Sequence, residues 1–483
     1  MLFNSIDFAL FLPVVFVLYW FTSKNSRRIQ NYIILISSYV FYGWWDWRFL
    51  ILVLCSTLVD YFVGIRLSKE HKPGNRKFLL WISLMVNLGL LGIFKYYNFF
   101  ISNFTEAFSI LGYSLQSTTL NIILPVGISF YTFQTLSYTL DIYHRKIQPT
   151  HDFISFAAFV SFFPQLVAGP IERASKLLPQ FRHNRSFNYH SATDGLRQMV
   201  WGLFKKVVIA DNCGAFADMI FNNSNEYSGI ALVLGAVMFA FQIYGDFSGY
   251  SDIAIGTSRL FGFDLSRNFA YPYFSRDIAE FWRRWHISLS TWFRDYVYIP
   301  LGGSKAGIWK NIRNIFIIFI VSGFWHGANW TFIIWGLLNA IYFLPIFLFK
   351  THRNHLNVVA ENSVLPSANE TFRIFITFSL TTIAWIFFRA ENLGHALSFV
   401  AGIFNPQHGF FTGIPKAGIL LVTFSLVIFM IAIEWLGRHH EYALEKLIAP
   451  SPKILRWSYY SALIFIIGMF MQTNETPFIY FQF

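Results

Sequence analysis

A histidine stands in one of the most apolar stretches of this 483-residue chain. His326 belongs to the segment FWHGAN at Phe324–Asn329, within a nearly uncharged region from Ile315 to Phe349. An ionisable side chain at that depth in a bilayer costs several kcal/mol unless it faces protein or water, so we interpret His326 as a functional residue. We expect Gly323 and Gly327 to break the helix and leave His326 beside a cavity. The alternative is a core histidine that is hydrogen-bonded to a neighbouring carbonyl.

A second histidine, His286, follows Arg283, Arg284 and Trp285 in the segment from Arg276 to Arg313. Planar guanidinium groups suit phosphates and pyrophosphates, so Arg283 and Arg284 are candidates for binding a nucleotide-bearing donor or, equally, lipid phosphates. Aromatic and basic residues alternate here at helical spacing, which predicts an amphipathic helix at the cytoplasmic interface. In that position His286 could also be solvated or packed under a tryptophan.

Two carboxylates form a third polar group at the end of an apolar span. Asp246 and Asp252 enclose hydroxyl residues and glycines directly after Gly229–Tyr244. Such a group could orient a histidine or relay protons. We favour a helix terminus here, with Ser251 or Asp252 capping the next helix.

The elements that must position these residues are membrane-spanning helices. The chain is 55% hydrophobic and only 13% charged, which lies outside the balance of soluble proteins. Apolar segments recur along the whole length, so we expect one all-α, membrane-embedded domain over residues 1–483, with roughly eleven crossings. The expected spans are Ile6–Phe21, Ile29–Tyr42, Phe49–Ile65, Phe78–Phe94, Leu120–Leu140, Leu196–Phe221, Gly229–Tyr244, Ile315–Val321 with Trp330–Phe349, Phe372–Phe388, Ile419–Trp435 and Trp457–Met471.

Three further segments are expected to be irregular or polar. Pro164 and Gly169 within Phe153–Pro170 predict a re-entrant or broken helix that is buried among neighbours. An aromatic hairpin is expected between Tyr96 and Leu111, and a polar loop from Thr351 to Glu370.

The formal net charge of +12 comes from basic residues between apolar segments, such as Arg27 and Arg28. By the positive-inside rule these loops are cytoplasmic, which places both termini outside the cytoplasm. The basic loops predict contacts with membrane lipids and argue against nucleic-acid binding. Cys55 and Cys213 lie in separate apolar regions, so neither a disulfide framework nor a metal site is expected.

Several of these segments resemble the membrane-bound O-acyltransferase family, and within it the bacterial polysaccharide-modifying branch. The resemblance extends from Met1 to about residue 389, whereas the helices from about residue 414 onward are looser. It is carried by residues 281–296 and 325–329, and by residues 125–131, 164–170 and 246–252.

The resemblance implies a polytopic α-helical acyltransferase fold with His326 as the catalytic histidine. His326 would lie between a cytoplasmic donor tunnel and a cavity open to the other side. His286 is a second catalytic candidate, at a position where many eukaryotic relatives carry asparagine. Asn329, Asp246 and Asp252 are supporting polar residues. Acetyl-CoA is the implied donor substrate, with no bound cofactor.

The implied reaction is O-acetylation of an extracytoplasmic polysaccharide, such as alginate, by a multi-pass protein of the bacterial inner membrane. Relatives of this branch work with an extracytoplasmic esterase-like acetyltransferase, which we expect to dock near the tail Phe478–Phe483. Transfer to peptidoglycan and D-alanylation of teichoic acid are the alternatives. A transporter is a further alternative, but it predicts an internal pseudo-symmetry that the sequence does not show.

Overall fold

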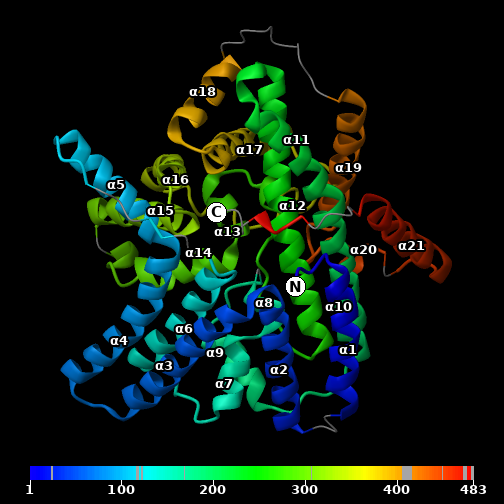
Figure 1. Cartoon of the computed structure of the whole chain (residues 1–483). Coiled ribbons are helices and arrows are strands. Elements are labelled where there is room, and N and C mark those ends of the chain that lie inside the picture. Colours follow the sequence, from blue (N-terminus) through cyan, green and yellow to red (C-terminus); the bar gives the residue numbers. More distant parts are fainter. Residues whose placement is uncertain are drawn as a thin grey trace. The chain divides into compact units, whose positions relative to one another are not determined.

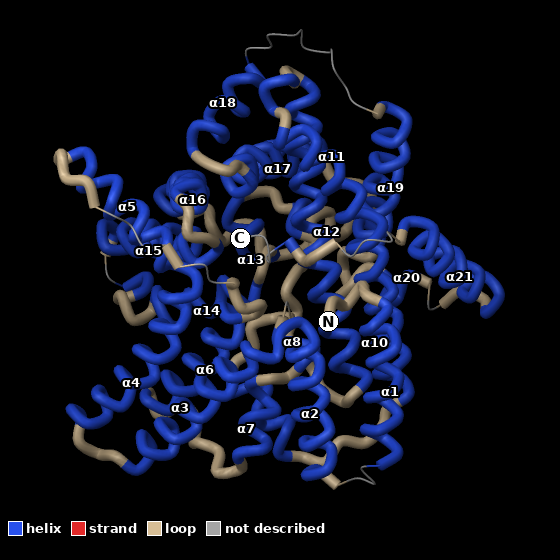
Figure 2. The backbone as a smooth tube through the Cα atoms, in the orientation of Figure 1, coloured by secondary structure: helices blue, strands red, loops and turns tan. Residues whose placement is uncertain are grey.

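A computed structural model of the protein describes residues 1–22, 26–115, 119–120, 123–167, 169–305, 307–404, 416–448, 450–471 and 476–479. All regular secondary structure within these residues is helical (Figure 2). The prediction of an all-α membrane protein is thereby confirmed. Six stretches of the described residues are long and apolar enough to cross a membrane: Arg27–Lys69, Pro73–Ile110, Ile230–Leu260, Trp330–Leu348, Ala368–Arg389 and Gly418–Leu436. The total number of crossings stays a prediction.

The helices form two compact units, and the first comprises residues 1–193 and 257–266. Its helices are α1 (Ile6–Thr22), α2 (Arg27–Asp46), α3 (Leu50–Lys69), α4 (Pro73–Leu91), α5 (Tyr97–Ile110), α6 (Ile128–Tyr143), α7 (Phe153–Val160), α8 (Phe163–Leu166) and α9 (Ala174–Leu177) (Figure 1). Buried Asp60 of α3 holds three of them together, because it accepts hydrogen bonds from Asn87 of α4 (2.8 Å) and Thr139 of α6 (3.0 Å). Hydrogen bonds of this kind join helices where no water is present.

The structure of the first unit confirms one of the predicted segments and differs from two others. The broken helix over Phe153–Pro170 is confirmed as α7 and α8, which are separated at Ser161 and Phe162. The aromatic hairpin is wrong, since the segment is the single helix α5, joined to α4 through a π-helical turn at Gly92–Tyr96. The span expected from Leu120 becomes helical only at Ile128.

The second unit comprises residues 194–256 and 267–483 and holds every predicted site residue. Its helices are most of α10 (Tyr189–Leu203), then α11 (Asp211–Asn222), α12 (Ile230–Leu260) up to Gly256, α13 (Ile278–Arg284), α14 (Ile287–Phe293), α15 (Ile308–His326), α16 (Trp330–Leu348), α17 (Ala368–Arg389), α18 (Leu393–Phe404), α19 (Ala417–Leu436), α20 (Leu444–Leu447) and α21 (Lys453–Phe470). The lysine pair Lys205 and Lys206, within the expected span Leu196–Phe221, lies in the π-helical segment Phe204–Ala210 between α10 and α11.

The expected helix terminus after Tyr244 is wrong, because α12 continues without interruption to Leu260. Its glycines serve close packing: a Cβ added at Gly249 would lie 2.7 Å from the Gly202 carbonyl oxygen. The polar residues of this stretch are paired within the protein, as described below. Glycine and polar residues therefore mark a helix face that is packed against protein, and Ser251 and Asp252 cap no helix.

Candidate active site

The helical hairpin of α15 and α16 positions His326. The two helices lie side by side (Figure 1). They approach so closely that a Cβ at Gly323 would lie 2.2 Å from the Phe332 carbonyl oxygen, and one at Gly336 would lie 2.3 Å from that of Phe319. His326 is the last residue of α15, and extended Gly327 ends the helix. Gly323 therefore packs helices together and does not break α15, whereas the predicted break at Gly327 is confirmed.

Asn329 begins the second arm of this hairpin. Its Oδ1 accepts a hydrogen bond from the backbone N–H of Thr331 (3.0 Å), which caps α16, and its Nδ2 donates to the carbonyl oxygen of Glu391 (2.9 Å). An N-cap satisfies a backbone donor that the helix itself leaves open. The predicted supporting role of Asn329 thus has a structural basis in the turn that follows His326.

Gly323→Ala should test how far the position of His326 depends on this packing. The added methyl group would meet the backbone of α16, so the helices must separate, at a cost of about 1–3 kcal/mol. We expect a lower thermal midpoint in detergent and a reduced transfer rate per folded molecule. Gly468→Ala in α21 is the control, because nothing lies within 4 Å of its Cβ. Equal behaviour of the two variants would contradict the role of close packing.

Aromatic rings surround the His326 imidazole. His326 is 4% exposed. Its ring lies edge-to-face with Trp335 at 5.1 Å and with Phe388 at 5.3 Å between centroids, and it contacts Trp325 at 4.8 Å. The imidazole is thus buried among aromatic rings, which limits the access of bulk water to it.

His286 lies at the turn between two short helices. Helices α13 and α14 are separated by Trp285 and His286, and His286 has φ 42° and ψ 55°, in the left-handed region. Trp285 and His286 are each 1% exposed, which contradicts both a solvated histidine and a single amphipathic helix at the interface. The segment can be buried because its arginines are paired inside the protein. Its last part, from Ile308, belongs to α15.

A hydrogen bond and three aromatic rings define the position of the His286 imidazole. Nδ1 lies 3.1 Å from Oδ1 of Asn268, while Phe247 packs edge-to-face at 4.6 Å between ring centroids. The Phe269 ring is 6.4 Å away and nearly parallel. Trp325 lies 6.3 Å from His286 and also contacts His326, so one indole ring touches both histidines. The two predicted catalytic residues therefore share one aromatic neighbour.

Burial lowers the pKa of His286 from its ordinary value of 6.5 to about 3. The surroundings are apolar and place no anion against the ring, so the charged form is disfavoured. His286 is consequently a neutral imidazole throughout the physiological pH range. A neutral imidazole can act as a base or as a nucleophile.

A cavity of about 750 Å³ lies against the helices that carry or follow the two histidines, although neither histidine is among its lining residues. Its wall includes Leu289 and Ser290 of α14 and Phe319 and Ser322 of α15. His286 precedes Leu289 by one helical turn, and His326 follows Ser322 by one turn on the same helix face. Lining residues of α14 and α15 are thus one helical turn from the two histidines along the chain. A volume of this size can hold a drug-sized ligand or the thiol arm of a larger one.

Basic residues mark the mouth of this cavity. Arg294, Lys305 and Arg353 line it, and no acidic residue is among its lining residues. Arg294 pairs with Asp295 at 2.7 Å, whereas Lys305 and Arg353 form no ion pair with any described residue. Burial and the nearby arginines lower the pKa of His352, also at the mouth, so the positive charge comes from the three basic side chains.

Arg283 and Arg284 do not line this cavity, and their guanidinium groups hold the loop that does. Arg283 donates to the carbonyl oxygens of His352 (2.8 Å) and His355 (2.7 Å), and Arg284 pairs with Glu280 at 2.8 Å. Trp285 is buried among other aromatic rings. The two arginines predicted to contact a donor therefore hold the loop that lines the cavity, and Trp285 packs in the aromatic core.

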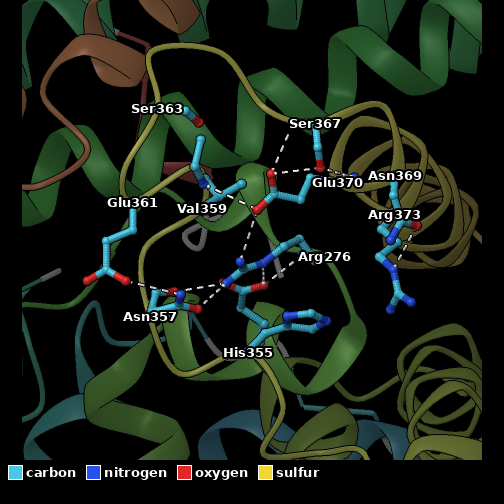
Figure 3. A network of polar contacts seen from close by, with 12 residues as sticks. Arg276, His355, Asn357, Val359, Glu361, Ser363, Ser367, Asn369, Glu370 and Arg373 are labelled. Carbon is cyan, nitrogen blue, oxygen red and sulfur yellow. Dashed lines mark hydrogen bonds and ion pairs between the residues drawn. The ribbon is translucent and has the colours of Figure 1, made fainter.

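Arg276 anchors the same loop from a third side. Figure 3 shows its guanidinium between Asn357 of the loop and Glu370 at the start of α17. It donates to the Asn357 carbonyl oxygen at 2.9 Å and lies 3.3 Å from the Glu370 carboxylate. The polar loop predicted over Thr351–Glu370 is thus an ordered part of the cavity mouth, positioned by arginines.

Asp246 and Asp252 form ion pairs with the two lysines of the π-helical segment. Asp246 lies 2.9 Å from Lys206, which also pairs with Asp211 at 2.8 Å, and Asp252 lies 2.6 Å from Lys205. The two carboxylates are thus engaged by lysines. Ser251, which lies between them in the sequence, is linked to His286 through Asn268. Its Oγ accepts a hydrogen bond from Nδ2 of Asn268 (3.1 Å), and Oδ1 of Asn268 lies 3.1 Å from Nδ1 of His286.

The beginning of the C-terminal tail is buried in the second unit. Phe478 is 0% and Ile479 2% exposed, and the backbone N–H of Ile479 donates to Asp246 Oδ2 at 2.7 Å. The Phe478 ring contacts Phe247, which in turn contacts His286. Docking of a partner on Phe478 and Ile479 is therefore contradicted. The rest of the expected docking segment, residues 480–483, lies outside the described residues.

Asn268 is the site residue that sequence reasoning missed. It is fully buried and joins His286 to Ser251, although 18 positions separate it from His286 in the chain. Its local sequence contains no feature that distinguishes it from an ordinary loop asparagine. Only the pairing of residues 268–270 with residues 284–287 brings it to the imidazole.

Comparison with known proteins gives a consistent result. The model of MBOAT, the membrane-bound O-acyltransferase family, matches residues 145–388. The probable alginate O-acetylase AlgI of Pseudomonas aeruginosa is 42% identical over 409 residues, which cover 84% of this chain and 75% of the relative. The peptidoglycan O-acetyltransferase of Helicobacter pylori is 38% identical, covering 83% and 80%. The teichoic acid D-alanyltransferase of Streptococcus thermophilus is 28% identical, covering 54% and 68%.

Proposed function

Because the chain belongs to the membrane-bound O-acyltransferase family, and is thus a multi-pass O-acyltransferase, we propose that it transfers acetyl groups from cytoplasmic acetyl-CoA for O-acetylation of an extracytoplasmic polysaccharide. The observation that carries this proposal is the cavity of about 750 Å³. Basic side chains line it at one part, and its lining residues Leu289 and Ser322 are one helical turn from His286 and His326 along the chain. A thioester donor with a charged nucleotide end and a long uncharged arm matches such a shape.

Each end of the donor has a counterpart in the cavity. The phosphates of acetyl-CoA would meet Lys305, Arg353 and Arg294 at the mouth. The uncharged pantetheine arm would run along the apolar walls of α14 and α15 and bring the thioester to the two histidines. The aromatic enclosure around His326 keeps water from hydrolysing the thioester.

The proposed reaction assigns the proton transfer to His326. Its neutral imidazole accepts the proton of the acceptor hydroxyl as that oxygen attacks the thioester carbonyl carbon. The carbon–sulfur bond then breaks, and the imidazolium returns the proton to the departing thiolate. One ester forms and one free thiol leaves, so protons balance. A correctly placed base contributes about 10²–10⁴ in rate.

The relatives bear on the acyl group and the acceptor. The alginate O-acetylase and the peptidoglycan O-acetyltransferase are similar to this chain to nearly the same degree, at 42% and 38% identity. The D-alanyltransferase is 28% identical over a smaller share of this chain. Acetyl is therefore favoured over D-alanyl. Alginate or a similar exopolysaccharide is the first candidate acceptor, and peptidoglycan is the second.

The proposal includes a place and a partner. We place the chain in the inner membrane of a bacterium, with the basic mouth on the cytoplasmic side. An extracytoplasmic esterase-like acetyltransferase would complete transfer to the polymer, as expected from the family resemblance. Membrane lipids surround the spans listed above.

The proposed function is tested in proteoliposomes that contain the full-length chain. The vesicles are those in which the mouth of the cavity faces outward. Acetyl-CoA labelled in the acetyl group is added outside them, and acceptor sugars are enclosed inside. Appearance of labelled ester inside supports the proposal. Label movement without thioester cleavage would indicate a transporter, and a strict preference for a D-alanyl thioester would indicate the D-alanylation alternative.

Charge reversal at the mouth should raise the KM for acetyl-CoA. Lys305→Glu together with Arg353→Glu removes the two proposed ion pairs with the donor phosphates, each worth about 1 kcal/mol when exposed. Loss of one or both pairs corresponds to a roughly five- to thirtyfold increase in KM. The KM for acetylpantetheine, which lacks the nucleotide phosphates, should not change. Arg373→Glu is the matched control, since exposed Arg373 does not line the cavity. An equal rise for both donors would contradict phosphate recognition at these residues.

A further inference from the structure

The side chain of Asn268 lies against one ring nitrogen of His286. Oδ1 of Asn268 accepts from the Ser288 hydroxyl at 2.8 Å and from the Ser288 backbone N–H at 3.3 Å, and it lies 3.1 Å from His286 Nδ1. The Ser288 backbone N–H can only donate, so it orients the amide with Oδ1 toward His286, while Nδ2 donates to Ser251 at 3.1 Å. The Ser288 hydroxyl also lies 3.4 Å from Nδ1, but its shorter bond is to Oδ1 of Asn268. A carbonyl oxygen can only accept hydrogen bonds, so the short contact with Nδ1 requires Nδ1 to donate.

The other nitrogen of His286 is then unprotonated. A neutral imidazole carries one proton, and a proton on Nδ1 leaves the lone pair on Nε2. Nε2 is buried and has no hydrogen-bond partner in the part of the chain that the structure describes. A basic nitrogen that is desolvated and unpaired in this way is costly, which favours a use in binding or chemistry over a structural one.

The backbone holds the two residues in register. The N–H of Ile287 donates to the carbonyl oxygen of Asn268, and the N–H of Ala270 donates to that of Arg284, each at 2.9 Å. These bonds lie on either side of His286, whose left-handed conformation disfavours most residue types. A strained residue persists only where its surroundings fix it, and such residues concentrate at functional sites.

The charged residues on the elements around the ring are engaged elsewhere. On α12, Asp246 pairs with Lys206 and Asp252 with Lys205. On α13, Arg284 pairs with Glu280, and Arg283 donates to loop carbonyl oxygens. Arg267 donates to the carbonyl oxygen of Phe269, and on α15 His326 and the His286 ring share Trp325 as a neighbour. The shortest polar contact of the imidazole is therefore the one with Asn268.

We propose that Asn268 is a positioning residue that fixes His286 as the Nδ1-protonated tautomer and so presents Nε2 as the reactive atom of this histidine. Ser251 and Ser288 hold the amide of Asn268 in the required orientation. Nε2 is the atom of His286 that is available to a substrate, and Asn268 acts through it. The kinetic part of this inference rests on the proposed acetyl transfer, whereas the tautomer itself does not.

The tautomer can be measured without any activity assay. Nitrogen-15 NMR of the full-length protein labelled at histidine distinguishes protonated from unprotonated ring nitrogens, and the signal missing from His286→Gln identifies His286. We expect a protonated Nδ1 and an unprotonated Nε2 in wild type, and a mixed or reversed pattern in Asn268→Ala. A protonated Nε2 in wild type would overturn the proposal, even if acetyl transfer proved correct.

Kinetics provide the second readout. Asn268→Ala should lower kcat about 10²-fold with little change in the KM for acetyl-CoA. Asn268→Asp keeps the acceptor oxygen but adds a charge, which favours imidazolium. It should retain activity above neutral pH and lose it as the pH falls, whereas wild type shows no such acid limb from His286.

Asn314→Ala is the matched control for a purely structural effect. Asn314 is as buried as Asn268, and its side chain donates to the Leu301 carbonyl oxygen at 3.2 Å. Its activity should follow the amount of folded protein, with an unchanged pH profile. If Asn268→Ala and Asn268→Asp behaved like this control, the proposal would be overturned. Absence of acetyl transfer by wild type would instead remove the proposed function and leave the NMR result standing.

Discussion

Replacing His326 with alanine is expected to lower acetyl transfer by about 10²–10⁴-fold, the range for loss of a general base. The imidazole ends α15 one turn beyond the cavity wall at Ser322, and no other titratable side chain is in ring contact with Trp335 among the described residues. In the proposed reaction, its loss removes the proton acceptor for the incoming hydroxyl. The KM for acetyl-CoA should change little, because the proposed phosphate contacts are with Lys305 and Arg353 and do not involve His326. The measurement is the initial rate in proteoliposomes.

The His326→Ala measurement requires two further variants as controls. Alanine leaves a void in an aromatic enclosure, so His326→Gln, which better preserves side-chain volume, should confirm that the loss concerns chemistry. His439→Ala, at an exposed loop histidine, should behave like wild type. Full transfer by folded His326→Ala protein would contradict the assignment of this residue as the base.

His286→Asn is the second large effect, with an expected loss of at least about 10²-fold in kcat. Asparagine tolerates the left-handed conformation at this position better than most residues do, so the fold should be preserved. The substitution removes the basic Nε2 and the donor to Asn268. A drop in rate without a drop in the thermal midpoint would therefore isolate the chemical contribution of the imidazole.

The same variant separates two roles for His286. If His286 carries the acetyl group as a nucleophile, brief reaction with labelled acetyl-CoA should leave label on wild type that is absent from His286→Asn. If it acts only on protons, wild type should carry no label, although its rate still exceeds that of the variant. Wild-type activity in His286→Asn would exclude both roles.

The comparison of sequence with structure is clearest at α12. Gly245, Gly249 and two aspartates resemble a helix end when they are judged from neighbouring residues alone. In the folded protein Lys205 and Lys206 neutralise the aspartates, and Gly249 allows contact with the Gly202 backbone. The helix therefore continues, because the groups that would end it have partners on another helix.

Arg283 and Arg284 illustrate the same limit for function. Paired arginines beside a histidine favour a phosphate site, and the sequence contains nothing to show that these two bind loop carbonyls and Glu280. The basic residues that do line the cavity come from three separate segments, at Arg294, Lys305 and Arg353. Their convergence depends on how α13 to α16 pack, which no local pattern records.

The sequence by itself determined that this is an all-helical membrane protein and singled out His326 as a functional candidate. Both conclusions follow from transfer free energies: long apolar segments form helices in a bilayer, and an ionisable residue there is costly unless it faces protein or water. The tertiary structure alone decided what surrounds that residue. The cavity, the buried state of His286 and its bond to Asn268 depend on contacts between segments that are distant in the chain, and their energies are absent from any single segment.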